Sequence, residues 1–240
     1  MFGKKIVCGK CNSVNPPDAV RCVHCGEKLL SIRKNIVWNN CESDISQRFD
    51  LSESANHFDK TLIVANGTQV IMVVGGECKG VLPAGTYDKF GTTLKRCGVV
   101  NQEKIISIIF IDAAELTITF SILDNEIQTR DGQNIGADGK LSIRINEPED
   151  FYQNYFKNKS SLRITDLNRD FQEPISYALR NFVSNYSLSQ LHGDNGVNSR
   201  LEKEIISHLN YVFDSKGIEA MELNWIKFKP RESFSKYSYT

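Results

Sequence analysis

Two CxxC pairs, ten residues apart, constrain the N-terminal part of this chain more tightly than any other sequence feature. The pairs are Cys8 with Cys11 and Cys22 with Cys25. A two-residue spacer lets one tight turn present two thiolates to the same ion, and four thiolates fill the tetrahedral shell that zinc prefers. The spacing therefore predicts a small module, residues 1–34, built around one structural Zn²⁺ ion with these four cysteines as its ligands.

The residues around each pair support this interpretation. Asn12 and Gly26 follow the second cysteine of each pair, and these two residue types tolerate the left-handed backbone that such a turn needs. His24 lies inside the second pair, and we expect it to be an exposed residue because the cysteines complete the shell. A complete shell leaves no coordination position for a substrate, so we expect no catalytic metal.

The remaining cysteines show no metal-binding spacing. Cys41, Cys78 and Cys97 have no cysteine or histidine close in sequence, so we expect small buried or half-buried side chains.

The N-terminal sequence MFGKKIVCGK lacks the apolar segment of a secretory signal, and no uncharged stretch is long enough to span a bilayer. We therefore expect a cytoplasmic protein whose thiols stay reduced.

The charge is balanced overall but uneven along the chain. There are 29 Lys and Arg against 29 Asp and Glu, so no overall field attracts nucleic acid or anionic lipid. Residues 1–34 nevertheless carry seven basic and two acidic side chains. A four-thiolate zinc centre has a charge of about −2 and neutralises part of this excess. Nucleic-acid contact through Lys10, Arg21 and Lys28 stays open as an alternative.

Strand patterns dominate the first half of the rest of the chain. Residues 35–60 are polar with isolated aromatics and no steady period, which predicts a linker and an entry segment that leads into the larger domain. Strand-like segments follow in 61–87 and 105–146, and the Asn-Gly and Gly-Gly pairs between the first of them indicate consecutive antiparallel hairpins. Residues 105–111 are almost continuously apolar and therefore favour a central strand.

Helical periodicity begins near Pro148. We expect a short helix from Pro148, a longer amphipathic one with Thr165 as cap and Pro174 as a kink or restart, and another ending at Gly217. Residues 217–228 then predict a final strand, and 231–240 a polar tail. The order of strands, helices and a strand predicts an α+β domain over residues 61–230.

Catalytic signatures are absent from the sequence. It contains no P-loop, GxGxxG, GxSxG or HExxH motif, and its four histidines are scattered. The GGECKG segment precedes no helix and is predicted to be a hairpin turn rather than a phosphate loop. We therefore expect a non-enzymatic protein without catalytic residues, without a small-molecule substrate, and with zinc as its one cofactor.

Two stretches resemble known families. CGKCNSVNPP and RCVHCGEKLL, within residues 6–30, are similar to the two knuckles of short zinc ribbons. LIVANGTQVIMVVGGECKGVLPAGTYDKF and EIQTRDGQNIGADGKLSIRINEPEDFY resemble segments of the SPFH or band 7 domain, a likeness that runs over residues 35–228. Within that family the chain most resembles the soluble bacterial members likened to a poxvirus virion core protein.

The second resemblance implies a scaffold. SPFH proteins assemble into large oligomers, often at membranes, and gather other proteins there, so we expect a homo-oligomer with protein partners. The N-terminal hydrophobic segment of membrane-anchored relatives and the long coiled coil of many others have no counterpart here, which leaves peripheral contact with the inner face of a membrane as an open alternative. A zinc-ribbon regulator that binds nucleic acid is the second hypothesis.

Overall fold

The computed structural model describes residues 6–8, 10–16, 19, 21–27, 29, 35–38, 43–51, 60–97 and 105–230. The chain divides into two compact units. Unit 1 comprises residues 1–39 and 48–110, and unit 2 comprises residues 40–47 and 111–240. The interval 61–230, expected to be one domain, is thus divided between the units at Phe110.

Unit 1 is built mainly from strands. Outside the cysteine module its elements are β3 (Asn35–Val37), β4 (Asp44–Leu51, from Arg48 onward), β5 (Thr61–Val64), β6 (Thr68–Val74), β7 (Glu77–Leu82), β8 (Gly85–Tyr87), α1 (Phe90–Arg96) and β9 (Ile106–Asp112, up to Phe110). One sheet has the strand order β3-β5-β8, and the other the order β4-β9-β6-β7. β9 lies between two neighbours and is buried along its length, which confirms the predicted central strand.

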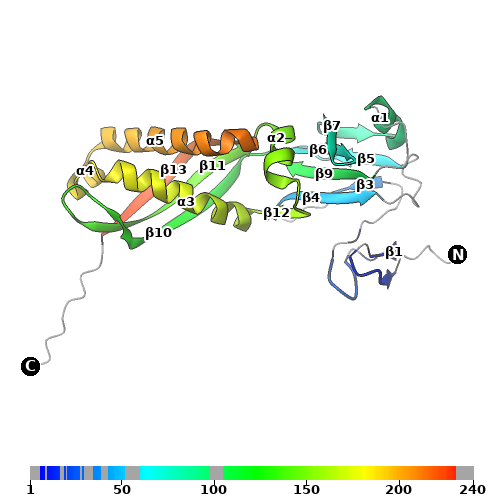
Figure 1. Cartoon of the computed structure of the whole chain (residues 1–240), viewed down its shortest axis with the longest axis horizontal. Coiled ribbons are helices and arrows are strands. Elements are labelled where there is room, and N and C mark those ends of the chain that lie inside the picture. The colour runs from blue at the N-terminus through cyan, green and yellow to red at the C-terminus, as the bar shows by residue number, and fades with distance from the viewer. Residues whose placement is uncertain are drawn as a thin grey trace, which may run out of the picture. The chain divides into compact units, whose positions relative to one another are not determined.

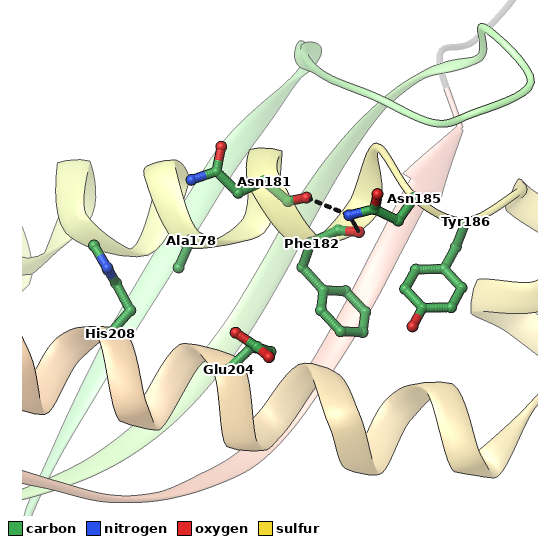
Figure 2. A pocket seen from close by; sticks show the side chains of 7 residues that line it. All are labelled: Ala178, Asn181, Phe182, Asn185, Tyr186, Glu204 and His208. Carbon is green, nitrogen blue, oxygen red and sulfur yellow. Dashed lines mark hydrogen bonds between the residues drawn. The ribbon is translucent and has the colours of Figure 1, made fainter.

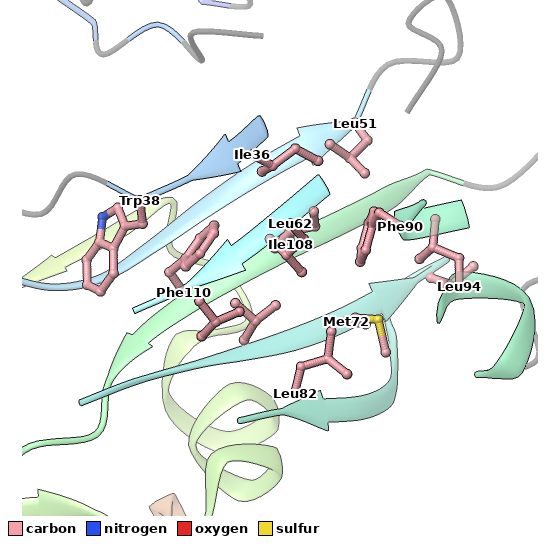
Figure 3. Close-up of a cluster of buried hydrophobic side chains, with 13 residues drawn as sticks. Ile36, Trp38, Leu51, Leu62, Met72, Leu82, Phe90, Leu94, Ile108 and Phe110 are labelled. Carbon is pink, nitrogen blue, oxygen red and sulfur yellow. The ribbon is translucent and has the colours of Figure 1, made fainter. Parts of the chain in front are cut away.

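A hydrophobic cluster joins the elements of unit 1. It takes side chains from both sheets and from α1, as Figure 3 shows. The Phe110 ring contacts two other aromatic rings in this cluster. Its centroid lies 5.8 Å from that of Trp38 and 5.6 Å from that of Phe49. Phe90 and Leu94 of α1 are fully buried in the same cluster. Burial of these apolar groups is the main force holding this unit together.

The segment 35–60, predicted as a linker and entry segment, contributes β3 and β4, and its aromatics Trp38 and Phe49 pack on Phe110. One expectation for this part of the chain was wrong. β5 and β6 do not form a hairpin, since β5 pairs with β3 and β8 instead. The β6–β7 hairpin is confirmed, with Gly75 and Gly76 in its turn at positive φ.

Unit 2 combines a sheet with helices. Its elements are the first part of β4, β10 (Leu116–Gln128), β11 (Asn134–Ile145), α2 (Pro148–Phe151), the π-helix η1 (Tyr152–Phe156), β12 (Ser161–Arg163), α3 (Ile164–Val183), α4 (Leu188–Gly193), α5 (Asn195–Phe213), the 3₁₀ helix η2 (Asp214–Lys216) and β13 (Ile218–Pro230). The main sheet has the antiparallel order β10-β11-β13, and β12 pairs with the first part of β4.

Helices α3 and α5 cover one face of the β10-β11-β13 sheet (Figure 1). Ile118, Phe120 and Ile122 alternate with exposed residues along β10, which confirms the predicted amphipathic strand. The two helices are joined by the stacked rings of Phe171 and Phe213, whose centroids are 3.9 Å apart. The result is the expected α+β architecture with antiparallel sheets, C-terminal helices and a final strand.

Side-chain amides from the helices occupy both outer edges of this sheet. On β10, the Thr119 N–H donates to Asn168 Oδ1 at 3.1 Å, and Gln172 Nε2 donates to the Ser121 carbonyl at 2.5 Å. On β13, Asn210 of α5 bonds the backbone of Ala220. Unpaired backbone groups at a sheet edge are a template for pairing with another chain. The helices thus close part of each edge.

The helix boundaries differ from the prediction. α3 begins at Ile164, one residue before Thr165, and the Arg163 N–H donates to the Asp166 carboxylate at 3.0 Å, so Thr165 is not the cap. α3 also continues through Pro174 without a restart. Gly217, with φ of 65°, closes the helical segment after α5 as predicted, and β13 follows it.

Candidate metal centre

The first knuckle of the cysteine module is a tight turn between β1 (Ile6–Val7) and β2 (Val14–Asn15). The Asn12 N–H donates to the Cys8 carbonyl at 2.9 Å, and the Cys8 N–H donates to the Ser13 carbonyl at 2.9 Å. Asn12 has φ of 56°, the left-handed conformation expected for it. The turn directs the sulfurs of Cys8 and Cys11 to the same side.

The second knuckle repeats the first. The Gly26 N–H donates to the Cys22 carbonyl at 3.0 Å, and the Cys22 N–H donates to the Glu27 carbonyl at 2.7 Å. Gly26 has φ of 71° and occupies the position that Asn12 has in the first knuckle. Both left-handed positions predicted from the sequence are therefore present, and the two turns present their cysteines equivalently.

The four sulfurs form one cluster. The ligand atoms of Cys8, Cys11, Cys22 and Cys25 all lie within 4.8 Å of one another. The Sγ atoms of Cys8 and Cys25 are 3.6 Å apart, and those of Cys11 and Cys22 are 3.5 Å apart. At a Zn–S distance of about 2.3 Å, tetrahedral sulfurs lie about 3.8 Å apart. The cluster has the size and the soft donor set for one such ion; the identity of the metal stays a prediction.

The local environment gives these thiols unequal pKa values. Desolvation opposes ionisation of Cys22, but hydrogen bonds from the backbone N–H groups of Cys25 and His24 lower its pKa to about 6. A backbone hydrogen bond from Glu27 favours the Cys25 thiolate, yet desolvation and the neighbouring sulfurs raise the pKa of Cys25 to about 12. A divalent cation would replace the retained protons and stabilise all four thiolates together.

Asn15 connects the two knuckles and was not singled out from the sequence. Its Nδ2 donates to the Ser13 carbonyl at 2.8 Å in the first knuckle, and its Oδ1 accepts from the Val23 N–H at 2.8 Å in the second. The side chain is 2% exposed. Asn15 therefore fixes the distance between the two cysteine pairs independently of any ion.

The basic residues near the cluster are partly engaged within the module. Lys10 forms an ion pair with Glu27 at 2.9 Å, and Arg21 Nη1 donates to the Gly26 carbonyl at 3.3 Å. Lys28 lies outside the described residues. His24 is exposed, as expected. These contacts reduce the charge that the module presents to a nucleic acid.

Exposed apolar side chains are the other surface feature of the module. Val7 is 60% exposed and Val14 is 54% exposed, and the two are direct cross-strand partners in β1 and β2. Val23, at the tip of the second knuckle, is 73% exposed. We call the exposed side chains of Val7, Val14 and Val23 the valine surface. Adjacent exposed apolar groups, such as the Val7–Val14 pair, are typical of contact sites for other proteins.

The other cysteines are not part of a metal cluster in the described ranges, where the four knuckle cysteines form the single group of metal-ligating side chains. Cys78 and Cys97 are half-buried, as predicted, and desolvation raises the pKa of Cys97. Cys41 lies outside the described residues.

None of the helices in the described part of the chain combines the length and the apolar composition that a bilayer crossing requires.

Comparison with known proteins adds the family. A search among curated proteins finds no match. The sequence profile described as SPFH domain / Band 7 family matches residues 62–235, which is most of the chain and includes the elements from β6 to β13. The antiparallel strands, the C-terminal helices and the final strand are those expected for this domain, and the chain belongs to the SPFH domain / Band 7 family.

Proposed function

We propose that this protein is a non-enzymatic scaffold that self-associates and recruits protein partners, with a zinc ribbon as its partner-binding module. SPFH domains are often scaffold-like and membrane-associated. The observation that carries the proposal is the valine surface, which is exposed beside a cysteine cluster whose closed shell leaves no position for chemistry.

The engagement of the basic residues favours protein over nucleic acid as the partner. A nucleic-acid reader needs cations that are free to reach phosphates. Lys10 is paired with Glu27, and Arg21 bonds a backbone carbonyl. The side chains of the valine surface, in contrast, are each more than half exposed. A zinc structural site fits this role because it holds a small module rigid without a large core.

Self-association rests on the family and is tested by light scattering of the purified chain. We expect a mass of several copies that persists when the module is removed by starting the chain at Asn35. A strict monomer at micromolar concentration for both chains contradicts the scaffold.

The recruitment test compares two variants of the intact chain. A Val7→Ser/Val23→Ser variant should keep its zinc and its oligomer mass but lose the proteins that co-purify with the wild type. A Lys10→Ala/Arg21→Ala variant should keep those proteins. If the charge variant instead loses salt-dependent retardation of RNA or DNA that the valine variant retains, the module is a nucleic-acid reader.

A peripheral membrane contact has its own support in unit 2. The face of the β10-β11-β13 sheet opposite the helices carries Trp225, 44% exposed, which is the cross-strand partner of Lys140. Lys227 lies two residues further on the same face. An interfacial tryptophan beside lysines suits the negatively charged inner surface of a membrane, and this supports, as part of the proposal, a cytoplasmic protein that contacts that surface.

Vesicle flotation tests this contact. The wild type should float with phosphatidylserine vesicles at low salt, and a Trp225→Ala/Lys227→Ala variant should not. Lys203→Ala, at an exposed position of α5, is the matched control and should float like the wild type. Equal flotation of all three proteins, or of none, removes the membrane contact from the proposal.

A further inference from the structure

A pocket of about 290 Å³ lies between helices α3 and α5 of unit 2 (Figure 2). The cysteine module belongs to unit 1. The pocket lining comes from the C-terminal half of α3, the turn that follows α3, and the middle of α5. The lining residues are Ala178, Asn181, Phe182, Asn185, Tyr186, Glu204 and His208.

Polar groups lie on both walls of this pocket. Glu204 and His208 are four residues apart on α5 and therefore face the same direction, whereas Asn181 lies on α3 and Asn185 in the turn after it. Ala178 and Phe182 are 7% and 8% exposed and form the apolar floor. The pocket is thus an apolar base with a polar rim.

Glu204 is the one acid in the lining, and the lining contains no Lys or Arg. Among the residues that the structure describes, Glu204 makes no ion pair, not even with Arg200 one turn earlier on α5. The Asn185 amide nitrogen donates to the carbonyls of Asn181 and Phe182, at 2.9 and 3.4 Å, so its oxygen is the atom left to accept. The Glu204 carboxylate and the Asn185 amide oxygen are therefore the acceptors that a cationic group could use here.

Aromatic rings complete the site. Phe182 and Tyr186 are stacked, with centroids 4.8 Å apart, and Figure 2 shows the Phe182 ring beside the Glu204 carboxylate and the Tyr186 ring beyond it. His208 is held at the other end by stacking on Tyr177, 5.1 Å away. Aromatic rings attract cations through their negative faces, and the attraction adds to that of a nearby carboxylate.

We propose that this pocket receives the guanidinium group of an arginine side chain from a partner protein. A planar guanidinium can stack on an aromatic ring and donate two hydrogen bonds to a carboxylate, which a lysine ammonium cannot. The volume is at the lower end of the range for small-molecule pockets, roughly 300 Å³, and suits one side chain better than a larger ligand. The inference is independent of the valine surface.

The test is an NMR titration of the full chain with N-acetyl-arginine N-methylamide. N-acetyl-leucine N-methylamide and free arginine serve as parallel probes. We expect the capped arginine to shift the amide signals of the 178–186 and 204–208 segments, and the capped leucine to leave them unchanged. Glu204→Gln should weaken binding about tenfold or more, because a charge-assisted hydrogen bond is lost.

Glu202→Gln is the matched control, since it removes the same charge from α5 at a position that does not line the pocket. It should bind the capped arginine like the wild type. Tyr186→Leu gives a second probe and should also weaken binding by removing the stacked ring. Equal affinity in the Glu204 and Glu202 variants, no shift with the capped arginine, or a response to free arginine alone would overturn the proposal.

Discussion

Asn210 of α5 bonds both backbone polar groups of Ala220 in β13. Its Nδ2 donates to the Ala220 carbonyl at 3.1 Å, and the Ala220 N–H donates to its Oδ1 at 2.7 Å. Ala220 is 2% exposed, so water does not replace a lost partner. We expect Asn210→Ala to lower the free energy of unfolding by about 2–4 kcal/mol, because two buried backbone groups lose their hydrogen bonds. Urea denaturation followed by circular dichroism measures the change.

Asn198→Ala is the control for this prediction. Asn198 lies on the same helix, is exposed, and its side chain has no hydrogen bond among the described residues. The expected change is within about 0.5 kcal/mol. Since Ala favours a helix more than Asn does at both positions, a similar loss in both variants would mean that the bonds to Ala220 do not set the difference.

Cys8→Ser tests the metal centre. Replacing one of four thiolates removes a soft ligand, so we expect zinc content to fall from one ion per chain towards zero and the module to unfold. The strands from Thr61 onward have their own hydrophobic cluster and should stay folded. Elemental analysis measures the zinc, and thermal unfolding of the remaining strands measures their stability.

Cys97→Ser is the matched change outside the cluster. It also replaces a thiol by a hydroxyl, but Cys97 packs against the cluster of unit 1 and is no member of the cysteine group. It should keep its zinc. Collapse of the whole chain in Cys8→Ser would show that the module and the rest do not fold separately.

The predictable parts of this fold are those that local chemistry decides. The left-handed turns at Asn12 and Gly26 follow from residue type and CxxC spacing, and the cap at Gly217 follows from the same property of glycine. The alternation along β10 likewise depends only on neighbours in sequence. Each of these predictions is confirmed because no distant residue is needed to define it.

The missed features depend on residues far apart in sequence. β5 was assigned to a hairpin with β6, but its partners β3 and β8 are chosen by burial against the common cluster rather than by the Asn-Gly turn. β4 has no steady period because its two parts belong to different units. No pattern in the sequence indicates either choice.

The candidate site shows the same division. The four cysteines were predicted by number, whereas Asn15 was missed because its two partners become neighbours only when both knuckles have formed. The pairing of Lys10 with Glu27 across the knuckles is also non-local. An asparagine directly after Val14, between two CxxC pairs, was the one available signal for Asn15.

Gly217 allows close contact between the start of β13 and the turn before α2. A Cβ atom at this position would stand 2.7 Å from the Phe151 nitrogen and collide with the Glu147 carbonyl oxygen, and φ is 65°. We expect Gly217→Ala to lower the free energy of unfolding by about 2–5 kcal/mol, from backbone strain and the collision together. Gly193→Ala has nothing within 4 Å of its Cβ and should change stability by less than about 1 kcal/mol. Equal effects in the two variants would contradict the role of Gly217.

Asp138 makes part of the stability dependent on pH. Its carboxylate bonds Lys229 across the β11–β13 pair and accepts from Ser121 Oγ at 2.8 Å, and these bonds hold its pKa below the ordinary value of 3.8. Since the unfolded chain then takes up the proton first as pH falls, this stabilisation is complete above about pH 5 and is lost as pH falls through the folded pKa. The wild type should therefore lose stability between about pH 5 and pH 3, the range in which carboxylates usually take up protons. Asp138→Asn should already be less stable than the wild type at pH 7, and its stability should change less on acidification.

Asp124→Asn is the control. Asp124 is an exposed acid on β10 without a hydrogen bond among the described residues, so this variant should follow the wild-type profile. Thermal unfolding midpoints across this pH range decide the matter, because parallel profiles for all three proteins would mean that Asp138 contributes nothing that protonation can remove.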